Sequence, residues 1–311
     1  NHLNDFTCNS ILFLAKALFS HDDVLPPFHL ITQGVQAVGT STDEKELYPS
    51  VLWGLARTLA LENQPPCTII DLSSSPSSAE IQNLLLEILS PSAPSIVLRG
   101  TQRFVPHLAP QTVLDKHFVS IHSEATYLIT GGYGALGLHF AEWLVAKGAR
   151  NLVLTGRKGV ASPERLEKLK QQGCNITIHA MDVSNKEQLS HLIEHIKIAM
   201  PALKGIIHAA GILEDGTFLE QTPQSFLNVM QPKVLGAWNL YQLTHDVSLD
   251  FFVLCSSMAS VTGSPGQSNY AAANAFLDTL ASYGRSQGKP LLSINWGPWE
   301  GDGLANQDVT K

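Results

Sequence analysis

The first residues whose types and spacing suggest chemistry form a glycine-rich loop. Gly131-Gly132-Tyr133-Gly134-Ala135-Leu136-Gly137 directly follows an apolar segment typical of a buried strand, 126–130, and precedes a predicted helix over 138–146. Glycines in such a loop let main-chain amides approach a pyrophosphate, and the N-terminus of the helix adds partial positive charge. Tight turns also produce glycine patterns, but a strand before the loop and a helix after it favour a dinucleotide-binding site.

Two cations indicate which dinucleotide is bound. Gly156, Arg157 and Lys158 follow the next predicted strand, where an NAD enzyme usually carries an acid for the ribose hydroxyls. Cations there favour a 2′-phosphate, and hence NADPH, over the alternative of a solvated basic turn. Asp182 and Val183 close the third predicted strand and suit the adenine edge, although an acid in this place is also a common turn former.

Ser257, Tyr270 and Asn274 form a second group with chemical potential. Ser257 follows a predicted strand over 250–255, which puts its hydroxyl at the carboxyl edge of a parallel sheet, where ligands bind. Tyr270 and Asn274 are four residues apart in a predicted helix over 268–286, so both project from one helix face. Each residue alone has an ordinary structural interpretation, and their combination with the glycine loop is what favours catalysis.

Alternating strands and helices must position these groups. From residue 126 on, apolar strand segments alternate with helical segments, which predicts a Rossmann-like, doubly wound α/β domain with a parallel sheet and helices on both faces. The predicted strands are 126–130, 151–155, 175–180, 205–208, 250–255 and 291–295.

The first part of the chain repeats this pattern in a reduced form, with strands over 28–32 and 68–72 and helices over 46–62 and 79–89. It contains no glycine triplet, so we expect only one cofactor site. We therefore predict a truncated, Rossmann-like structural subdomain over residues 1–115, followed by a catalytic subdomain over residues 116–311.

Composition excludes several classes of protein. The 311 residues are 44% hydrophobic and 15% charged with a formal charge of −7, which argues against a disordered chain and against a nucleic-acid partner. The cysteines, Cys8, Cys67, Cys174 and Cys255, lack the spacing of a metal site or a disulfide framework, so we expect no metal and a cytoplasmic location. The apolar run 11–19 is too short to span a bilayer. The chain begins with Asn1 rather than Met, and we expect it to be a piece of a longer protein.

Residues 116–305 resemble the ketoreductase domain of a modular polyketide synthase, within the short-chain dehydrogenase/reductase superfamily. The first 115 residues are similar to the structural subdomain of that family, including segments 51–57 and 70–72. Most of the superfamily carries its lysine four residues after the tyrosine, whereas the exchange of Lys233 and Asn274 seen here is typical of polyketide and animal fatty-acid synthase ketoreductases. The matching segments are residues 130–137, His208-Ala209-Ala210-Gly211, Pro232-Lys233, Ser256-Ser257, Tyr270 with Asn274, and Asn295-Trp296-Gly297-Pro298-Trp299.

The resemblance implies NADPH-dependent reduction of a β-ketoacyl thioester to a β-hydroxyacyl thioester, with the substrate on the phosphopantetheine arm of an acyl carrier protein. The other implied partners are further domains of the same multienzyme. Tyr270 would protonate the carbonyl oxygen, Ser257 would donate a hydrogen bond to it, and a nearby Lys233 ammonium would favour the phenolate and hold the nicotinamide ribose. Asn274 would orient lysine or water. The implied cofactor contacts are residues 131–137, Arg157, Lys158, Asp182, Val183, Ala209, Ala210 and Gly211.

Taken alone, Lys233 would be expected as an exposed residue in the first turn of a helix over 234–243, because it follows a proline. The family resemblance reverses that expectation and gives the lysine a catalytic role.

The resemblance also implies a stereochemical class. Leu213-Glu214-Asp215 stands where one class carries Leu-Asp-Asp, and Thr262 stands where the other class carries a tryptophan. Together with Pro265 and Asn269 as further substrate-orienting residues, this pattern implies a B-type enzyme that yields a D-configured alcohol. The alternative for the acidic pair is an ordinary exposed loop.

Two other functions remain open at this point. A free-standing short-chain reductase would act on diffusible ketones, but the Lys233 and Asn274 exchange and the long first part of the chain argue against it. A catalytically silent scaffolding domain is the other, and the intact set of Tyr270, Ser257 and Lys233 argues against that.

Overall fold

The computed structural model describes residues 9–14, 16–17, 27–38, 47–62, 67–110, 119–157 and 162–299. The chain divides into two compact units, which we describe separately. Unit 1 consists of Asn1–Leu114, Leu213–Met230 and Ser256–Ser286, and unit 2 of Asp115–Ile212, Gln231–Cys255 and Gln287–Lys311. The subdomain boundary predicted near residue 115 lies outside the described residues and stays a prediction.

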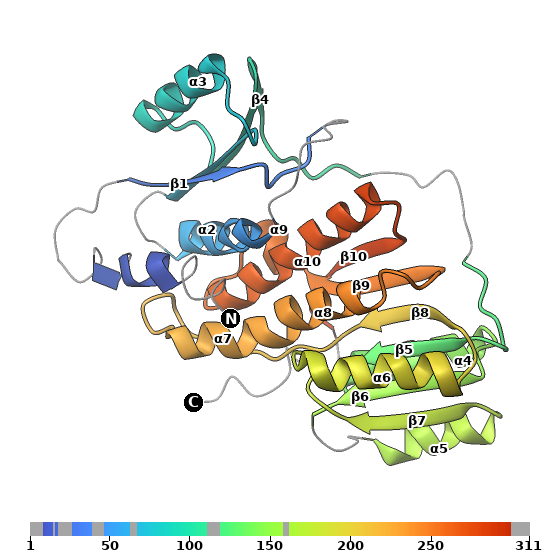
Figure 1. Ribbon diagram of the computed structural model, residues 1–311. Helices are drawn as coiled ribbons and strands as arrows, with labels where there is room; N and C mark the ends of the chain where they lie inside the picture. The colour runs from blue at the N-terminus through green and yellow to red at the C-terminus, as the bar shows by residue number, and fades with distance from the viewer. Residues whose placement is uncertain are drawn as a thin grey trace. The chain divides into compact units, whose positions relative to one another are not determined.

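A six-stranded sheet forms the centre of unit 2 (Figure 1). The pairings of β5 with β6 and β8, of β6 with β7, and of β8 with β9 are all parallel. The chain winds outward from β5 to β7 and then crosses back to β8, so its direction reverses between β5 and β8; ligands of doubly wound sheets bind at such a reversal. The strands in spatial order are β10 (Leu291–Trp296), β9 (Phe251–Ser257), β8 (Leu203–His208), β5 (Thr126–Thr130), β6 (Asn151–Gly156) and β7 (Asn175–Ala180).

Helices cover both faces of this sheet, as the sequence predicts. On one face, α4 (Ala135–Ala146) and α5 (Pro163–Gln171) share a core with β5 and β6 that includes Tyr127, Leu144 and Leu154. On the other face, α6 (Lys186–Ala199) and α8 (Gly236–Leu243) lie against each other (Figure 1). Burial from both sides explains the continuous apolar run of a strand such as β6.

Unit 1 has a smaller sheet in the order β1–β2–β3–β4. β1 (Phe28–Gln33), β2 (Cys67–Leu72) and β3 (Ser95–Arg99) are parallel, and β4 (Gln102–Phe104) pairs antiparallel with β3. Helix α2 (Val51–Leu61) lies between β1 and β2 in sequence, and α3 (Ser78–Leu89) lies between β2 and β3. The Rossmann-like α/β architecture is thus confirmed.

Helix α2 packs along α10 (Ser268–Ser286) within unit 1, which also contains α7 (Pro223–Met230) and α9 (Ala259–Thr262). The two helices meet at main-chain contact: a Cβ added to Gly54 would lie 2.1 Å from the carbonyl oxygen of Ala271. Only glycine permits that approach. The helix carrying Tyr270 and Asn274 is therefore seated on a helix from the first part of the chain.

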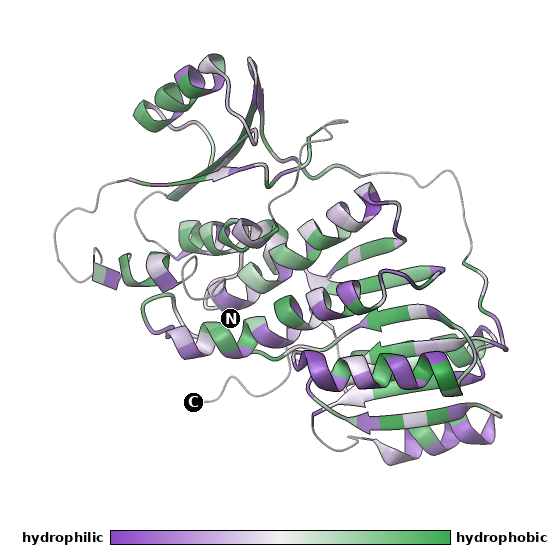
Figure 2. Cartoon of the chain, viewed as in Figure 1, coloured by the Kyte–Doolittle hydropathy of each residue, from purple (hydrophilic) through white to green (hydrophobic). Residues whose placement is uncertain are grey.

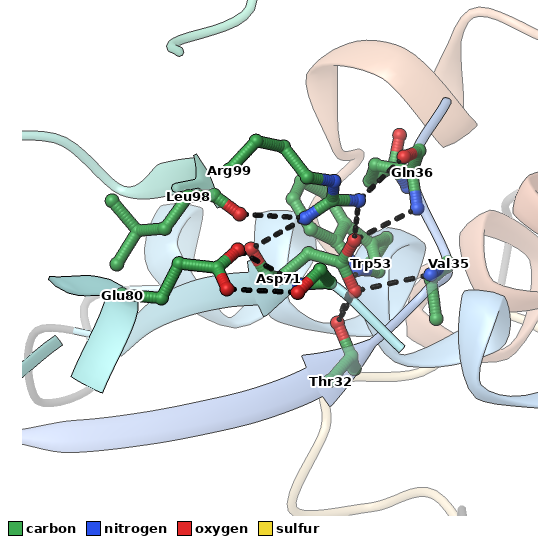
Figure 3. A network of polar contacts seen from close by, with 9 residues as sticks. Thr32, Val35, Gln36, Trp53, Asp71, Glu80, Leu98 and Arg99 are labelled. Carbon is green, nitrogen blue, oxygen red and sulfur yellow. Dashed lines mark hydrogen bonds and ion pairs between the residues drawn. The ribbon is translucent and has the colours of Figure 1, made fainter. Parts of the chain in front are cut away.

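A buried carboxylate closes the carboxyl end of the unit 1 sheet (Figure 3). Asp71, at 0% exposure, accepts hydrogen bonds from the Thr32 hydroxyl at 2.7 Å and from the main-chain amides of Val35 and Gln36 at 3.1 and 3.0 Å. Its second oxygen forms an ion pair with Arg99 at 2.6 Å. These bonds compensate for burying the charge. Protein groups thus occupy the strand ends, where a Rossmann fold would hold a ligand.

Helix α3 combines hydrophobic and hydrophilic residues along its length (Figure 2), and several of its apolar residues are exposed. Leu85, Leu86 and Leu89 are 56%, 65% and 81% exposed, whereas Glu80 and Glu87 are buried. Glu80 completes a capping box with Ser77 at the N-terminus of the helix, and Glu87 pairs with Arg103. The partners of the two carboxylates explain this reversal of the usual amphipathic arrangement.

Some elements differ from the sequence prediction. The helix predicted over 46–62 begins at Val51, after a 3₁₀ turn at Tyr48–Ser50 that contains Pro49. Strands β3 and β4 were not predicted. The helix predicted over 234–243 begins instead in a π-helical segment, Gln231–Leu235, that continues α7 into α8. Among the described residues, no helix is both long and apolar enough to cross a membrane.

Candidate functional site

The glycine loop of unit 2 has the geometry of a pyrophosphate cradle. Gly131 has φ +69°, and a Cβ there would lie 2.7 Å from main-chain atoms of Ala209 and Ala210 at the end of β8. A Cβ on Gly137 would lie 2.3 Å from the carbonyl oxygen of Gly131. The loop is therefore folded against the strand end by contacts that only glycine allows.

The N-terminus of α4 is suited to an anion. Its N-cap residue, Gly134, is extended and supplies no side-chain hydrogen bond to the first turn. Uncapped amides and the helix dipole together favour a phosphate. A Cβ on Gly134 would meet only the Gly131 carbonyl oxygen, at 3.4 Å, so the loop leaves space at this position. The cradle thus fits the pyrophosphate of a dinucleotide.

The other predicted cofactor residues of unit 2 differ in whether their side chains are accessible to a ligand. The Tyr133 ring is buried and occupies the space beside Gly156, so Tyr133 offers a ligand only its main chain. Arg157 is exposed directly after β6, and Lys158 lies outside the described residues. Asp182 accepts hydrogen bonds from the amide and hydroxyl of Ser184 at 2.9 and 2.7 Å, as a turn former does. Val183 is buried.

Lys233 is a buried cation, 4% exposed, in the π-helical segment. Its Nζ donates a hydrogen bond to the carbonyl oxygen of Cys255 at 3.0 Å, and its side chain packs against Gly211, where a Cβ would lie 2.9 Å from Cε. The expectation of an exposed lysine, drawn from the proline before it, is wrong. Pro232 lacks an amide hydrogen, and the wider π-helical turn accommodates it without ending the helix.

His208 lies beside this lysine at the end of β8. It is fully buried, and its Nδ1 lies 2.7 Å from the Thr130 hydroxyl. Burial, reinforced by the Lys233 charge, lowers the pKa of His208 to about 3. The ring is therefore neutral at physiological pH and cannot compete with lysine as the cation of this region. Burial also raises the pKa of the Cys255 thiol to about 12, which keeps that sulfur protonated and unreactive.

Unit 1 contains the other three predicted catalytic residues. Ser257 is the last residue of β9, and its Oγ accepts the Ala259 amide at 3.2 Å, which fixes the oxygen and turns its proton away from that amide. Asn274 is fully buried; its Nδ2 donates to the Tyr270 carbonyl oxygen at 2.8 Å, while its Oδ1 has no hydrogen-bond partner among the described residues. Ser256 Oγ also donates to the Asn274 carbonyl oxygen, at 3.2 Å.

Strand β9 carries both the hydrogen-bond acceptor of Lys233 and Ser257. Lys233 is bonded to the carbonyl of Cys255, and Ser257 follows two residues later in the chain. The set is divided between the two units: Lys233 belongs to unit 2, and Ser257, Tyr270 and Asn274 belong to unit 1.

The predicted substrate-orienting segments lie in direct contact within unit 1. Asn269 Nδ2 donates to the Glu214 carbonyl oxygen at 2.8 Å, and Gln267 Nε2 donates to Asp215 Oδ2 at 3.0 Å. The Gly216 amide donates to the Gly266 carbonyl oxygen at 2.8 Å. Asn269 Oδ1 also accepts the Tyr270 amide at 2.6 Å, so the position of these loops is coupled to the tyrosine. Leu213 and Pro265 lie in the same two loops.

Two residues of this arrangement were missed by sequence reasoning. Gln221, 2% exposed, donates to the carbonyl oxygens of Glu214 and Gly216 and accepts from Asn269 Nδ2. Gln267 holds Asp215. Neither glutamine belongs to a spacing pattern, because their roles depend on two loops meeting in space. The Glu214 carboxylate, which replaces an aspartate of the family pattern, accepts from Asn228 Nδ2 at 3.0 and 3.3 Å.

The doubly wound sheet with a glycine cradle at its reversal point defines a dinucleotide-binding, Rossmann-like protein. The KR domain family model matches residues 125–301. The chain therefore belongs to the KR domain family, the ketoreductase domains of polyketide synthases.

Curated relatives are much longer than this chain. It is 36% identical over 318 residues to a 6-methylsalicylic acid synthase of Arthrobotrys oligospora, which covers 96% of this chain and 18% of the relative. It is also 36% identical, over 288 residues, to the polyketide synthase GfsB of Streptomyces halstedii, covering 89% of this chain and 5% of the relative. The chain thus spans less than a fifth of these relatives.

Solved ketoreductases share the fold. A structure of A-type ketoreductases from a modular polyketide synthase superposes with a TM-score of 0.86 at 33% identity, over 95% of this chain and 63% of that one. The ketoreductase from the first module of phoslactomycin biosynthesis in Streptomyces sp. HK803 gives 0.83 at 31% identity, over 96% and 70%.

Proposed function

We propose that this chain reduces a β-ketoacyl thioester to a β-hydroxyacyl thioester with NADPH during polyketide chain extension. The observation that carries the proposal is the buried Lys233 in a chain of the ketoreductase family. Lys233 donates a hydrogen bond to the carbonyl oxygen of Cys255, and Cys255 lies two residues before Ser257. A buried ammonium is costly, and a role in favouring a phenolate explains its presence.

NADPH would supply the hydride. The main chain of residues 131–137 would hold its pyrophosphate, and the exposed Arg157 with Lys158 would pair with the 2′-phosphate. Asp182 and Val183 would border the adenine, and Ala209, Ala210 and Gly211 would border the part of the cofactor that crosses the reversal point.

The chain's own residues would manage the proton. Tyr270 would donate a proton to the carbonyl oxygen, and Ser257 would donate a hydrogen bond to the same oxygen as negative charge develops there. Lys233 would favour the phenolate that remains. The buried Asn274 Oδ1, which has no partner among the described residues, would accept a hydrogen bond from lysine or water and complete the set.

The substrate carrier and location belong to the same proposal. The substrate would be attached to the phosphopantetheine arm of an acyl carrier protein, in company with further domains of the same multienzyme, as the names and much greater lengths of the relatives suggest. The described cysteines are unpaired and buried, which agrees with a reducing, cytoplasmic location.

The first test is NADPH oxidation with a β-ketoacyl-pantetheine thioester. Tyr270→Phe should lower kcat by about 10²–10⁴-fold, because it removes the proton donor but keeps the ring. Tyr283→Phe on the same helix is the matched control and should retain wild-type kcat. Unchanged NADPH binding would show that the Tyr270 variant is folded; if that variant kept near-wild-type activity, the tyrosine would have no acid role.

We further propose the B-type stereochemistry, a D-configured alcohol. Support comes from Asp215, held by Gln267, from the Asn269 bond to the Glu214 carbonyl, and from Thr262 at the position of the other class's tryptophan. The fold does not decide the class, since A-type ketoreductases superpose well. Chiral chromatography of the product tests it, and a predominantly L-configured alcohol would refute it.

A further inference from the structure

One carboxylate from the first part of the chain holds both substrate-orienting loops of unit 1. Glu62, at the C-terminus of α2, accepts the Gly266 amide at 2.9 Å on Oε1 and the Phe218 amide at 2.7 Å on Oε2. Gly266 lies in the loop with Pro265 and Gln267, and Phe218 follows the 213–215 segment. The two oxygens therefore join loops that are about fifty residues apart in the sequence.

The neighbouring residues of α2 reinforce the same contact. Thr58, one helical turn before Glu62, accepts the Ser264 amide at 3.2 Å on its hydroxyl oxygen, and Arg57 donates to the Ser260 carbonyl oxygen. Thr58 and Glu62 are four residues apart and share one helix face. The last turn of α2 therefore binds the main chain of the segment between Ser257 and Tyr270 at successive points.

Glu62 differs from these neighbours because it reaches both loops. Hydrogen bonds to a charged acceptor are shorter and stronger than neutral ones, and a carboxylate can accept on both oxygens at once. Phe218 is fully buried and anchors its own loop, so the Glu62 bond fixes that loop at a second point. The Glu62 side chain therefore fixes the position of one loop relative to the other.

That relative position bears on the reacting groups. Gln267 of one loop donates to Asp215 of the other, and Asn269 connects the Glu214 carbonyl to the Tyr270 amide. A change in the relative position of the loops would shift Asp215 relative to Tyr270. The substrate carbonyl would then be held with less preference for one of its two faces toward the hydride donor, and the selectivity between the two product enantiomers would fall.

We propose that Glu62 is a positioning residue that controls the facial selectivity of the reduction, and this inference rests on the proposed function. Glu62 acts through the main chain of the two loops. It is remote in sequence from every catalytic motif, and it belongs to the part of the chain that the sequence assigns to a structural subdomain.

The test compares Glu62→Gln with Glu220→Gln. A glutamine at residue 62 keeps the size but has only one acceptor oxygen, so it cannot serve both loops. Glu220 is an exposed carboxylate of the same loop; within the described ranges it accepts hydrogen bonds from the Thr217 amide and hydroxyl at 2.9 and 2.8 Å, and its variant is the matched control. Each protein is assayed with an α-unsubstituted β-ketoacyl-pantetheine thioester, whose ketone is prochiral, for the ratio of the two product enantiomers.

The expected result is a fall of about tenfold in the enantiomer ratio for Glu62→Gln, equal to about 1.4 kcal/mol of lost discrimination, with no change for Glu220→Gln. Hydrogen exchange gives a readout independent of turnover: protection of the Phe218 and Gly266 amides should fall in Glu62→Gln alone. The NADPH affinity of Glu62→Gln should stay within about twofold of the wild-type value, because the substitution does not alter the glycine loop.

The outcomes separate this inference from the proposed function. Lost amide protection with an unchanged enantiomer ratio would make Glu62 purely structural and would overturn the inference. A wild-type protein without reductase activity would overturn the proposed function and the inference together, while hydrogen exchange would still report the contact. If Glu62→Gln does not unfold cooperatively, Glu62→Asp, which keeps the charge on a shorter side chain, replaces it with the same expectations.

Discussion

Lys233 shows how far a residue's neighbours in sequence can mislead. A lysine after a proline at the start of a predicted helix is ordinarily exposed, yet this one is buried in a π-helical turn. Its packing requires Gly211, which lies in the segment after β8 and outside the helix that carries the lysine. Family resemblance was needed to predict the role of Lys233, because π-helical turns have no sequence pattern that reveals them.

The buried His208 predicts a pH dependence of stability. Its pKa of about 3 in the folded state lies below the ordinary value of 6.5, so the unfolded state binds more protons between these values. Stability should therefore fall as the pH falls below 6.5, by about 2 kcal/mol from pH 7 to pH 5 for this group alone. Chemical unfolding at the two pH values measures it.

His208→Gln is the control for that prediction. The variant should lose about 2 kcal/mol of the difference between pH 7 and pH 5, because its side chain does not titrate, while every other group contributes equally in both proteins. If the free energy of unfolding depended on pH equally in the variant and the wild type, protonation of His208 would not destabilise the folded state, and the prediction would be wrong.

At the scale of elements, Gly54 makes the crossing of α2 and α10 sensitive to one methyl group. Gly54→Ala should lower the free energy of unfolding by about 3 kcal/mol, at the upper end of overpacking costs, because the obstruction at 2.1 Å is main chain and cannot rotate away. Denaturant titration measures this. Gly297→Ala, which would meet no atom within 4 Å, should change stability by less than about 0.5 kcal/mol; similar values for both variants would contradict the close crossing.

The elements that sequence predicts well are those with strong local signals. Strands β5 and β7 and helix α10 have the predicted bounds, because a largely apolar run defines β5, an apolar–polar alternation defines β7 and a long helical period defines α10. Strands β3 and β4 were missed because Pro91, Pro94 and nearby serines dominate that stretch. The outward apolar face of α3 was not predictable either, since it depends on where Glu80 and Glu87 find partners.

The candidate site follows the same rule. The glycine loop, Ser257, Tyr270 and Asn274 were predictable because each belongs to a local motif. Glu62, Gln221 and Gln267 were not, because each acts through hydrogen bonds between segments that are distant in sequence. Physical periodicity identifies elements, whereas the contacts between loops require the fold.

At the scale of the whole molecule, unit 1 combines residues from the first part of the chain with residues 213–230 and 256–286. Removing residues 1–110 should therefore expose the face of α10 that packs on α2. We expect the truncated chain to unfold without cooperativity and to bind a hydrophobic dye several-fold more strongly than the intact chain, as loosely packed states do. A truncated chain with a sharp thermal transition at the intact protein's Tm would contradict this.

The bare main-chain crossing at Gly54 also has a consequence for engineering. No side chain at that crossing could be exchanged to accommodate a foreign helix, so transplanting residues 256–286 alone into another ketoreductase domain would bring α10 against an unmatched surface. A graft that also carries residues 47–62 and 213–230 would preserve the crossing and both Glu62 hydrogen bonds in the recipient. The segments to be exchanged in recombination should therefore be chosen by their hydrogen bonds to α2. A single cut point along the chain would separate them.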